Sequence, residues 1–274
     1  MCGAGYCGAR EHGMATIQID GGTLYFETRG SGPVLIITGS PMGAGGFAQL
    51  AEALASDFTV ITHDPRGISR STLYDLEEDS TPDLRADDLV ALLDALDIET
   101  VDVFGSSGGA VTGLALVTRH PHRVRTLIAH EPPLLELLPD AAEQRAATQD
   151  IVDTYRSQGL GAAFAKFMAN AGFEPGDEGP PPSANPEQDA ADGARFLGHE
   201  LLGTATYVPD ASALTGRSVV VGLGADSANL LTADTSRALA ELLGTETVEF
   251  PGDHGGWMSH PQKFAAVVRR ELAP

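Results

Sequence analysis

The chain has 274 residues, with 38 acidic and 17 basic side chains, and its formal net charge at pH 7 is -21. This charge repels nucleic-acid phosphates and anionic lipid headgroups, so we expect neither a nucleic acid nor a membrane as partner. Hydrophobic residues make up 42% and aromatic residues 6%, which suits one large globular core. No run approaches the ~20 apolar residues of a membrane span.

Residues 1–15 form a glycine-rich opening that we predict to be a flexible extension of the fold. Both cysteines of the chain, Cys2 and Cys7, lie in it, and two cysteines cannot build a disulfide framework for a chain of this length. The first 13 residues lack the apolar core of a secretory signal. We therefore expect a cytoplasmic location.

The next segments alternate between strand and helix patterns. Residues 16–28 alternate in character on both sides of Asp20-Gly21-Gly22, which predicts an antiparallel hairpin. Helical stripes follow, one of them opened by Thr81 and Pro82 as N-cap and first-turn residues. Short apolar runs separate the stripes and are typical of buried parallel strands: 34–38, 59–62, 101–104, 124–129, 219–223 and 247–250. This alternation predicts a doubly wound, mostly parallel α/β sheet.

Between residues 132 and 216 the alternation stops. Two helix-like segments cover 141–158 and 160–171, and a proline- and acid-rich stretch follows at 174–183. We interpret 132–216 as a helical cap inserted after the sixth strand, with the core at 16–131 and 217–274. The proline- and acid-rich stretch cannot bury much apolar surface, which predicts a mobile loop.

The sequence Gly105-Ser106-Ser107-Gly108-Gly109 lies between the strand pattern 101–104 and a helical pattern. A serine on such a strand-to-helix turn adopts a strained conformation, which requires tiny residues two positions before and after it. No lysine follows, as it would in a phosphate-binding loop. Ser107 is therefore the candidate nucleophile.

A general base is expected near Ser107, and His254 is the best candidate among the eight histidines. It follows the last predicted strand in a glycine-rich loop, which can bring the imidazole over the sheet edge to which Ser107 points. Among the others, His12 lies in the tail and His63 beside a turn, while His120, His122 and His260 are expected at helix ends. No set of His, Cys and carboxylate residues has metal-ligand spacing, so we expect no metal and no cofactor.

From about residue 16 onward the chain resembles an α/β-hydrolase-fold enzyme. Ser107 lies in the equivalent of the nucleophile elbow, and His254 follows the last strand. The stretch 36–41 resembles the family's His-Gly-x-Pro oxyanion segment, with Thr38 in place of the usual His. The stretch 63–71 resembles its Asp-x-Arg-Gly-x-Gly-x-Ser turn. The resemblance covers nearly the whole chain, and it implies the fold but not the substrate.

Two carboxylates compete for the acid position of the triad. Asp226 follows the strand at 219–223, but the usual Gly-x-x-Asp pattern counted from Gly224 reaches Ser227 instead. Glu131 follows the strand at 124–129, where haloalkane dehalogenases and zearalenone-type lactonases carry their acid. A buried Glu needs a partner, and His254 is available. We favour Glu131 and keep Asp226 as the alternative.

These residues predict a serine hydrolase that cleaves a small-molecule carboxylic ester or lactone through an acyl-enzyme. The backbone amides of Ser40 and Gly108 would form the oxyanion hole, because Pro41 has no N–H to donate. A serine at 107 argues against epoxide-hydrolase and dehalogenase chemistry, which need a carboxylate nucleophile. The alternatives are C–C bond hydrolysis, hydroxynitrile lysis, cofactor-free perhydrolysis and a non-catalytic ligand receptor. The sequence leaves monomer and homodimer open.

Overall fold

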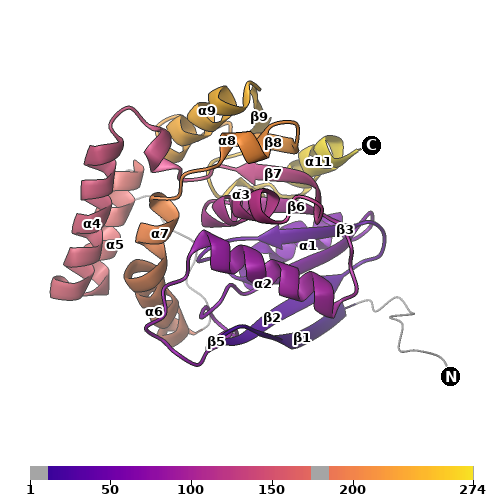
Figure 1. Ribbon diagram of the computed structural model, residues 1–274, viewed down its shortest axis with the longest axis horizontal. Coiled ribbons are helices and arrows are strands. Elements are labelled where there is room, and N and C mark those ends of the chain that lie inside the picture. The colour runs from indigo at the N-terminus through magenta and orange to yellow at the C-terminus, as the bar shows by residue number, and fades with distance from the viewer. Residues whose placement is uncertain (1–11, 174–184, 274) are drawn as a thin grey trace.

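The computed structural model of the protein describes residues 12–173 and 185–273. Within these ranges a nine-stranded sheet has the order β1-β2-β4-β3-β6-β7-β8-β9, with β5 paired to β2 (Figure 1). Strands β1 and β2 are antiparallel, and β4, β3, β6, β7, β8 and β9 are parallel to one another. The strands are β1 (His12–Ile19), β2 (Gly22–Arg29), β3 (Val34–Thr38), β4 (Thr59–His63), β5 (Thr72–Leu73), β6 (Val101–Ser106), β7 (Val124–His130), β8 (Ser218–Gly224) and β9 (Thr247–Phe250).

The predicted sheet is confirmed, with two local differences. Strand β1 begins at His12 and pairs with Arg29 of β2, so residues 12–15 belong to the sheet rather than to the predicted flexible extension. Strand β5, only two residues long, pairs with Gly22 and Thr23 of β2 and was not predicted. A pairing this short has no period that a sequence pattern can reveal. Residues 1–11 lie outside the described part of the chain.

Helices cover both faces of the sheet (Figure 1). On one face pack α2 (Pro82–Ala95), α3 (Gly108–Arg119) and α9 (Leu231–Leu243), and on the other pack α1 (Ala48–Leu54), α10 (Gly256–Ser259) and α11 (Pro261–Leu272). Alternate residues of one strand enter different cores, since Ile36 joins the first cluster while Leu35 and Ile37 join the second. Thr81 caps α2 as predicted, with Oγ1 accepting from Leu84 N.

The helical segment between β7 and β8 occupies the predicted cap region. Because β5 adds a strand, the sixth predicted strand is β7. The segment contains η2 (Leu135–Leu137), α4 (Ala141–Gln158), α5 (Leu160–Ala171), α6 (Pro186–Arg195), the π-helical η3 (Phe196–Glu200), α7 (Leu201–Ala205) and α8 (Ala211–Leu214). Figure 1 shows α4 and α5 as a hairpin beside α6 and α7. The loop predicted at 174–183 lies outside the described residues. No helix in the described ranges is long and apolar enough to cross a membrane.

Candidate active site

Ser107 occupies the turn between β6 and α3 with φ +56° and ψ -126°. Its N–H donates to His130 O at 2.9 Å, which fixes the turn against β7. Only glycine fits at positions 105 and 109, because a Cβ there would clash with the backbone. A Cβ on Gly109 would lie 2.1 Å from Thr38 O, and a Cβ on Gly105 would lie 2.5 Å from Gly109 O. This is the strained elbow that the sequence predicts.

Glu131 and His254 meet at the same edge of the sheet. His254 Nδ1 lies 2.6 Å from Glu131 Oε2. Glu131 follows β7 with a φ of +49° and is 0% exposed. Its carboxylate also accepts from Gly224 N and from Thr232 Oγ1, each at 2.8 Å. The buried carboxylate therefore has several donors, which satisfies the condition for placing a charge in the interior.

The electrostatic surroundings keep Glu131 ionised. Burial alone would raise the pKa of Glu131, but the hydrogen bond and the charge of His254 lower it to about 2, with a smaller contribution from His130. The hydroxyl of Ser227 makes a further, smaller contribution that lowers this pKa. Ser227 stands where counting from Gly224 places the usual acid, so the carboxylate of Glu131 lies near that position.

Asp226, the alternative acid, is exposed and its N–H donates to Gly252 O. No hydrogen bond or ion pair within the described ranges joins it to His254. The structure thus brings His254 to Glu131 and not to Asp226. It forms no hydrogen bond between Ser107 Oγ and His254 either, as far as the described residues go. Such catalytic contacts are often long in a ligand-free site and tighten with substrate.

A buried histidine supports this edge of the sheet and was not singled out from the sequence. His130 is 0% exposed, and its Nδ1 lies 3.1 Å from Ser106 Oγ. Burial lowers the pKa of His130 to about 4, so the ring is neutral at pH 7. Its ring centroid lies 6.4 Å from that of His254. Its other ring neighbours are Phe104, Phe250, Trp257 and Phe264.

Ser40 and Gly108, the expected oxyanion residues, lie against each other. A Cβ on Gly108 would lie 2.7 Å from Ser40 O and 3.3 Å from Ser40 Oγ. Gly108 is the first residue of α3, so its N–H has no partner inside the helix. The Ser40 N–H makes no hydrogen bond to another described residue. Both amides are therefore available to bind an anion beside Ser107.

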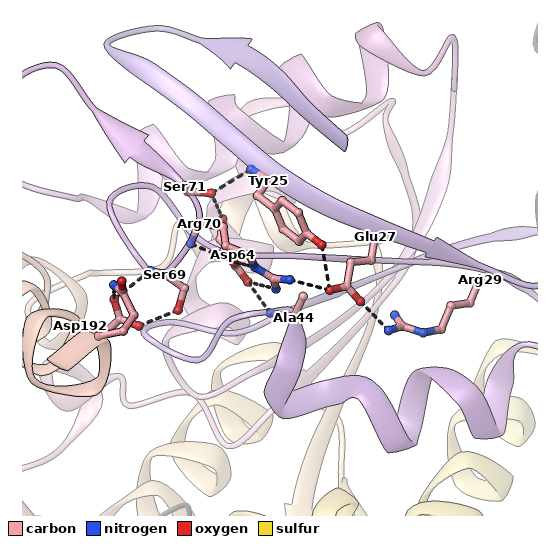
Figure 2. A network of polar contacts seen from close by, with 10 residues as sticks. Tyr25, Glu27, Arg29, Ala44, Asp64, Ser69, Arg70, Ser71 and Asp192 are labelled. Atoms are coloured by element: carbon pink, nitrogen blue, oxygen red, sulfur yellow. Dashed lines mark hydrogen bonds and ion pairs between the residues drawn. The ribbon is translucent and has the colours of Figure 1, made fainter. Parts of the chain in front are cut away.

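A polar network holds the loop that follows Ser40 (Figure 2). Asp64 accepts from Ala44 N at 2.8 Å and from Arg70 Nε at 2.7 Å. Arg70 also pairs with Glu27 at 2.9 Å and lies over the Tyr25 ring, with Cζ 3.6 Å from its centroid. The turn predicted at 63–71 thus fixes the loop of the oxyanion segment to β2.

The same turn contacts the cap (Figure 2). Asp192 of α6 accepts from Ser69 N at 2.8 Å and from Ser69 Oγ at 2.6 Å. Ser69 has φ +51°, a conformation that favours glycine, and it stands where the family motif has its second Gly. In the sequence, the contact between Ser69 and Asp192 is therefore indicated by a serine where the family motif has glycine. No group of three or more potential metal ligands occurs within residues 12–173 and 185–273.

Comparisons with known proteins agree with this fold. The model of the family described as alpha/beta hydrolase fold matches residues 32–189. A protein of Bacillus subtilis (strain 168) named uncharacterized hydrolase YraK is 33% identical over 260 residues, 91% of this chain and 92% of that protein. A zearalenone hydrolase of Bionectria ochroleuca is 29% identical over 272 residues, 93% and 96% of the two chains. A thermophilic esterase from Thermogutta terrifontis has a similar fold, with a TM-score of 0.74 at 22% identity over 95% of this chain and 98% of that chain. The chain therefore belongs to the α/β-hydrolase family and is a hydrolase.

Proposed function

We propose that this hydrolase cleaves a carboxylic ester or lactone by serine catalysis, with Ser107 as nucleophile, His254 as general base and Glu131 as the acid of the triad. The observation that carries the proposal is the contact of 2.6 Å between His254 Nδ1 and Glu131 Oε2. It lies at the sheet edge where Ser107 takes the strained elbow conformation. A buried, ionised carboxylate beside a histidine is the arrangement that holds the imidazole in one tautomer.

Acylation begins when Ser107 Oγ attacks the carbonyl carbon and its proton passes to His254 Nε2. The positive imidazolium is stabilised by the Glu131 carboxylate, which stays ionised because its pKa is about 2. The tetrahedral intermediate then collapses, the C–O bond breaks, and His254 gives its proton to the leaving alcohol. Water, deprotonated by His254, attacks the acyl-enzyme and releases the acid with Ser107 restored.

The negative oxygen of each tetrahedral intermediate would accept from the Ser40 and Gly108 amides. Each donor in such a hole contributes about 3 kcal/mol to transition-state stabilisation. Gly108 adds the partial positive charge of the α3 N-terminus. The contact between the two segments sets the spacing of the two donors.

The relatives favour a lactone as one substrate class. Two of them are named zearalenone hydrolase, and one of these matches 93% of this chain. The cap reaches the site, since Phe173, after α5, places its ring edge-on to His254 with centroids 6.5 Å apart. An aromatic edge beside the general base supplies an apolar surface for a ring-shaped substrate.

The test combines a covalent probe with turnover. The purified protein is incubated with a fluorophosphonate, the adduct is located by peptide mass spectrometry, and hydrolysis of p-nitrophenyl acetate is measured alongside. We expect one adduct, on Ser107, and a loss of kcat of about 10⁴-fold or more in Ser107→Ala. A folded protein with neither adduct nor turnover would contradict the proposal and favour a lyase or a ligand receptor.

A second assay addresses the substrate class. Zearalenone and a linear ester of matched size are compared by kcat/KM, with ring opening detected as the mass gain of one water. We expect Ser107-dependent opening of the lactone. Turnover of the linear ester alone would leave the serine mechanism in place and remove the lactone from the proposal.

A further inference from the structure

A buried carboxylate of the cap contacts one of the two proposed oxyanion segments. Ser40 Oγ donates to Glu200 Oε2 at 2.6 Å, and this hydrogen bond joins residues 160 positions apart. Glu200 is 1% exposed and is the last residue of the π-helical segment η3. Such π-helical segments often occur at functional sites, because the extra residue in the turn shifts a side chain from its regular direction.

The other proposed oxyanion residue is held in a related way. Gly108 O accepts from Thr112 Oγ1 at 3.1 Å. Thr112 Oγ1 in turn accepts from Arg85 Nε at 2.9 Å. Arg85 is 2% exposed, and its Nη2 donates to Thr204 Oγ1 of the cap at 2.9 Å. Two buried charged residues, Glu200 and Arg85, therefore each contact an oxyanion segment through a hydroxyl group. Glu200 belongs to the cap, and Arg85 donates to a cap residue.

We propose that Glu200 is a positioning residue that holds Ser40, and with it the Ser40 N–H, in the geometry of the oxyanion hole. The proposal rests on the proposed function, since it needs an oxyanion to form at Ser107. Glu200 acts through Ser40 and touches no reacting atom. Because Glu200 belongs to the cap, the position of the cap and the competence of the oxyanion hole are linked.

The energetic reason is preorganisation. An oxyanion donor contributes fully only when it already points to the position of the developing charge, and a misplacement of about 1 Å can lower the rate about 100-fold. Loss of the Glu200 contact would free Ser40 without removing its N–H. The substrate carbonyl in the ground state needs this donor less than the tetrahedral intermediate does. We therefore expect kcat to fall while KM changes little.

The charge of Glu200 is not required by this role. Burial raises the pKa of Glu200, while Arg85, the hydrogen bond from Ser40 and Arg195 oppose this and Asp192 adds to it. A carboxylate and a carboxylic acid both carry an oxygen that can accept from Ser40 Oγ. A glutamine can accept in the same way. Glu200→Gln should therefore retain activity where Glu200→Leu does not.

The experiment measures kcat and KM for p-nitrophenyl acetate in Ser40→Ala, Glu200→Leu, Glu200→Gln and the Ser40→Ala/Glu200→Leu double variant. We expect kcat to fall about 10- to 100-fold in Ser40→Ala and in Glu200→Leu, and no further in the double variant. Glu200→Gln should remain within about 5-fold of the original protein. The affinity for phenylboronic acid, whose adduct on Ser107 carries an oxyanion, should fall by the same factor as kcat.

The matched control is Ser212→Ala. It also removes a serine hydroxyl that donates at 2.6 Å to a cap carboxylate, that of Asp210, but at an exposed position of α8. We expect its kcat and boronic acid affinity to stay unchanged. Glu200→Leu leaves Arg85 with less compensating charge, so Ser40→Ala is the decisive variant if Glu200→Leu fails to fold.

The outcomes separate this inference from the proposed function. If the original protein labels on Ser107 and turns over, but Ser40→Ala has the kcat and the boronic acid affinity of Ser212→Ala, the positioning role of Glu200 is overturned and the serine mechanism stands. If the original protein neither labels nor turns over, the proposed function fails and this inference fails with it.

Discussion

His254 and Glu131 are 123 positions apart in the sequence, and their side chains meet at 2.6 Å across the ends of β9 and β7. Strand β8 lies between these two strands in the sheet. The carboxylate reaches past it because Glu131 turns off β7 with a φ of +49° and accepts from Gly224 N at the end of β8. The acid of the proposed triad is therefore not needed after β8, and the uncharged Ser227 occupies that position.

This contact predicts which carboxylate supports catalysis. Glu131→Gln should lower kcat about 10³- to 10⁴-fold, because an amide cannot stabilise the imidazolium and can favour the wrong tautomer of His254. The matched control is Asp226→Asn, which changes an exposed carboxylate and should leave kcat unchanged. Both variants are assayed with p-nitrophenyl acetate at pH 7. A larger loss in Asp226→Asn would reverse the assignment.

Local features of the sequence predict most of the fold and the elbow. Close contacts within the turn and with the neighbouring strand require the glycines around Ser107. The local sequence pattern is therefore enough to predict the elbow. The buried strands show as apolar runs for the same reason, and each predicted parallel strand lies within two residues of the observed one. The length of β1 and the two-residue strand β5 depend instead on pairing with β2, which no single-segment pattern contains.

Several site contacts depend on the packing of distant segments and could not be predicted. Glu200 reaches Ser40 because a π-helical turn in the cap directs it there, and no motif marks that turn. Thr232, at the start of α9, donates to Glu131. A threonine at the start of a helix is common, so its presence does not predict this contact. The sequence favours Glu131 as the acid of the triad but keeps Asp226 as the alternative, since both follow a strand at the same edge.

The elbow geometry predicts a severe effect for one added methyl group. Gly109→Ala would place a Cβ 2.1 Å from Thr38 O, so α3 or β3 must move. We expect a loss of at least about 2 kcal/mol in the free energy of unfolding, measured with urea. Gly45→Ala is the control, because its Cβ would have no atom within 4 Å. Equal stability of the two variants would show that the close approach at Gly109 is absent in solution.

The network of Asp64 predicts a structural role for the turn at residues 63–71. Asp64 is 1% exposed and pairs with Arg70 at 2.7 Å while accepting from Ala44 N. Asp64→Asn should lower the free energy of unfolding by about 2 kcal/mol, since it weakens the acceptor of the buried Ala44 N–H and removes one of the two carboxylates that pair with Arg70.

Asp57 provides the matched control for this substitution. It pairs with Arg269 at the same distance of 2.7 Å, but on the surface. Exposed ion pairs contribute little because water and salt screen them, so Asp57→Asn should change stability much less than Asp64→Asn. Chemical denaturation of both variants measures the difference. Similar losses would mean that Asp64 contributes no more than a surface residue.

The two buried histidines predict that the protein loses stability in mild acid. Burial lowers the pKa of His63 from 6.5 to about 4, and burial has the same effect on His130. As the pH falls below 6.5 the unfolded chain takes up protons at both residues, while the folded chain stays neutral there until about pH 4. Each histidine therefore contributes stability that is fully present above pH 6.5 and is lost by about pH 4, on the order of 3 kcal/mol each.

A single substitution tests this pH dependence. His63 is buried, and its Nε2 lies 3.0 Å from Thr38 Oγ1, so His63→Gln can keep a hydrogen bond there while removing the titrating group. The decrease in the free energy of unfolding between pH 7 and pH 4.5 should then be smaller by about 2 to 3 kcal/mol than in the original protein. His122→Gln, at an exposed position, should leave that decrease unchanged. An unaltered decrease in His63→Gln would mean that His63 titrates alike in the folded and unfolded chains, which is incompatible with its burial.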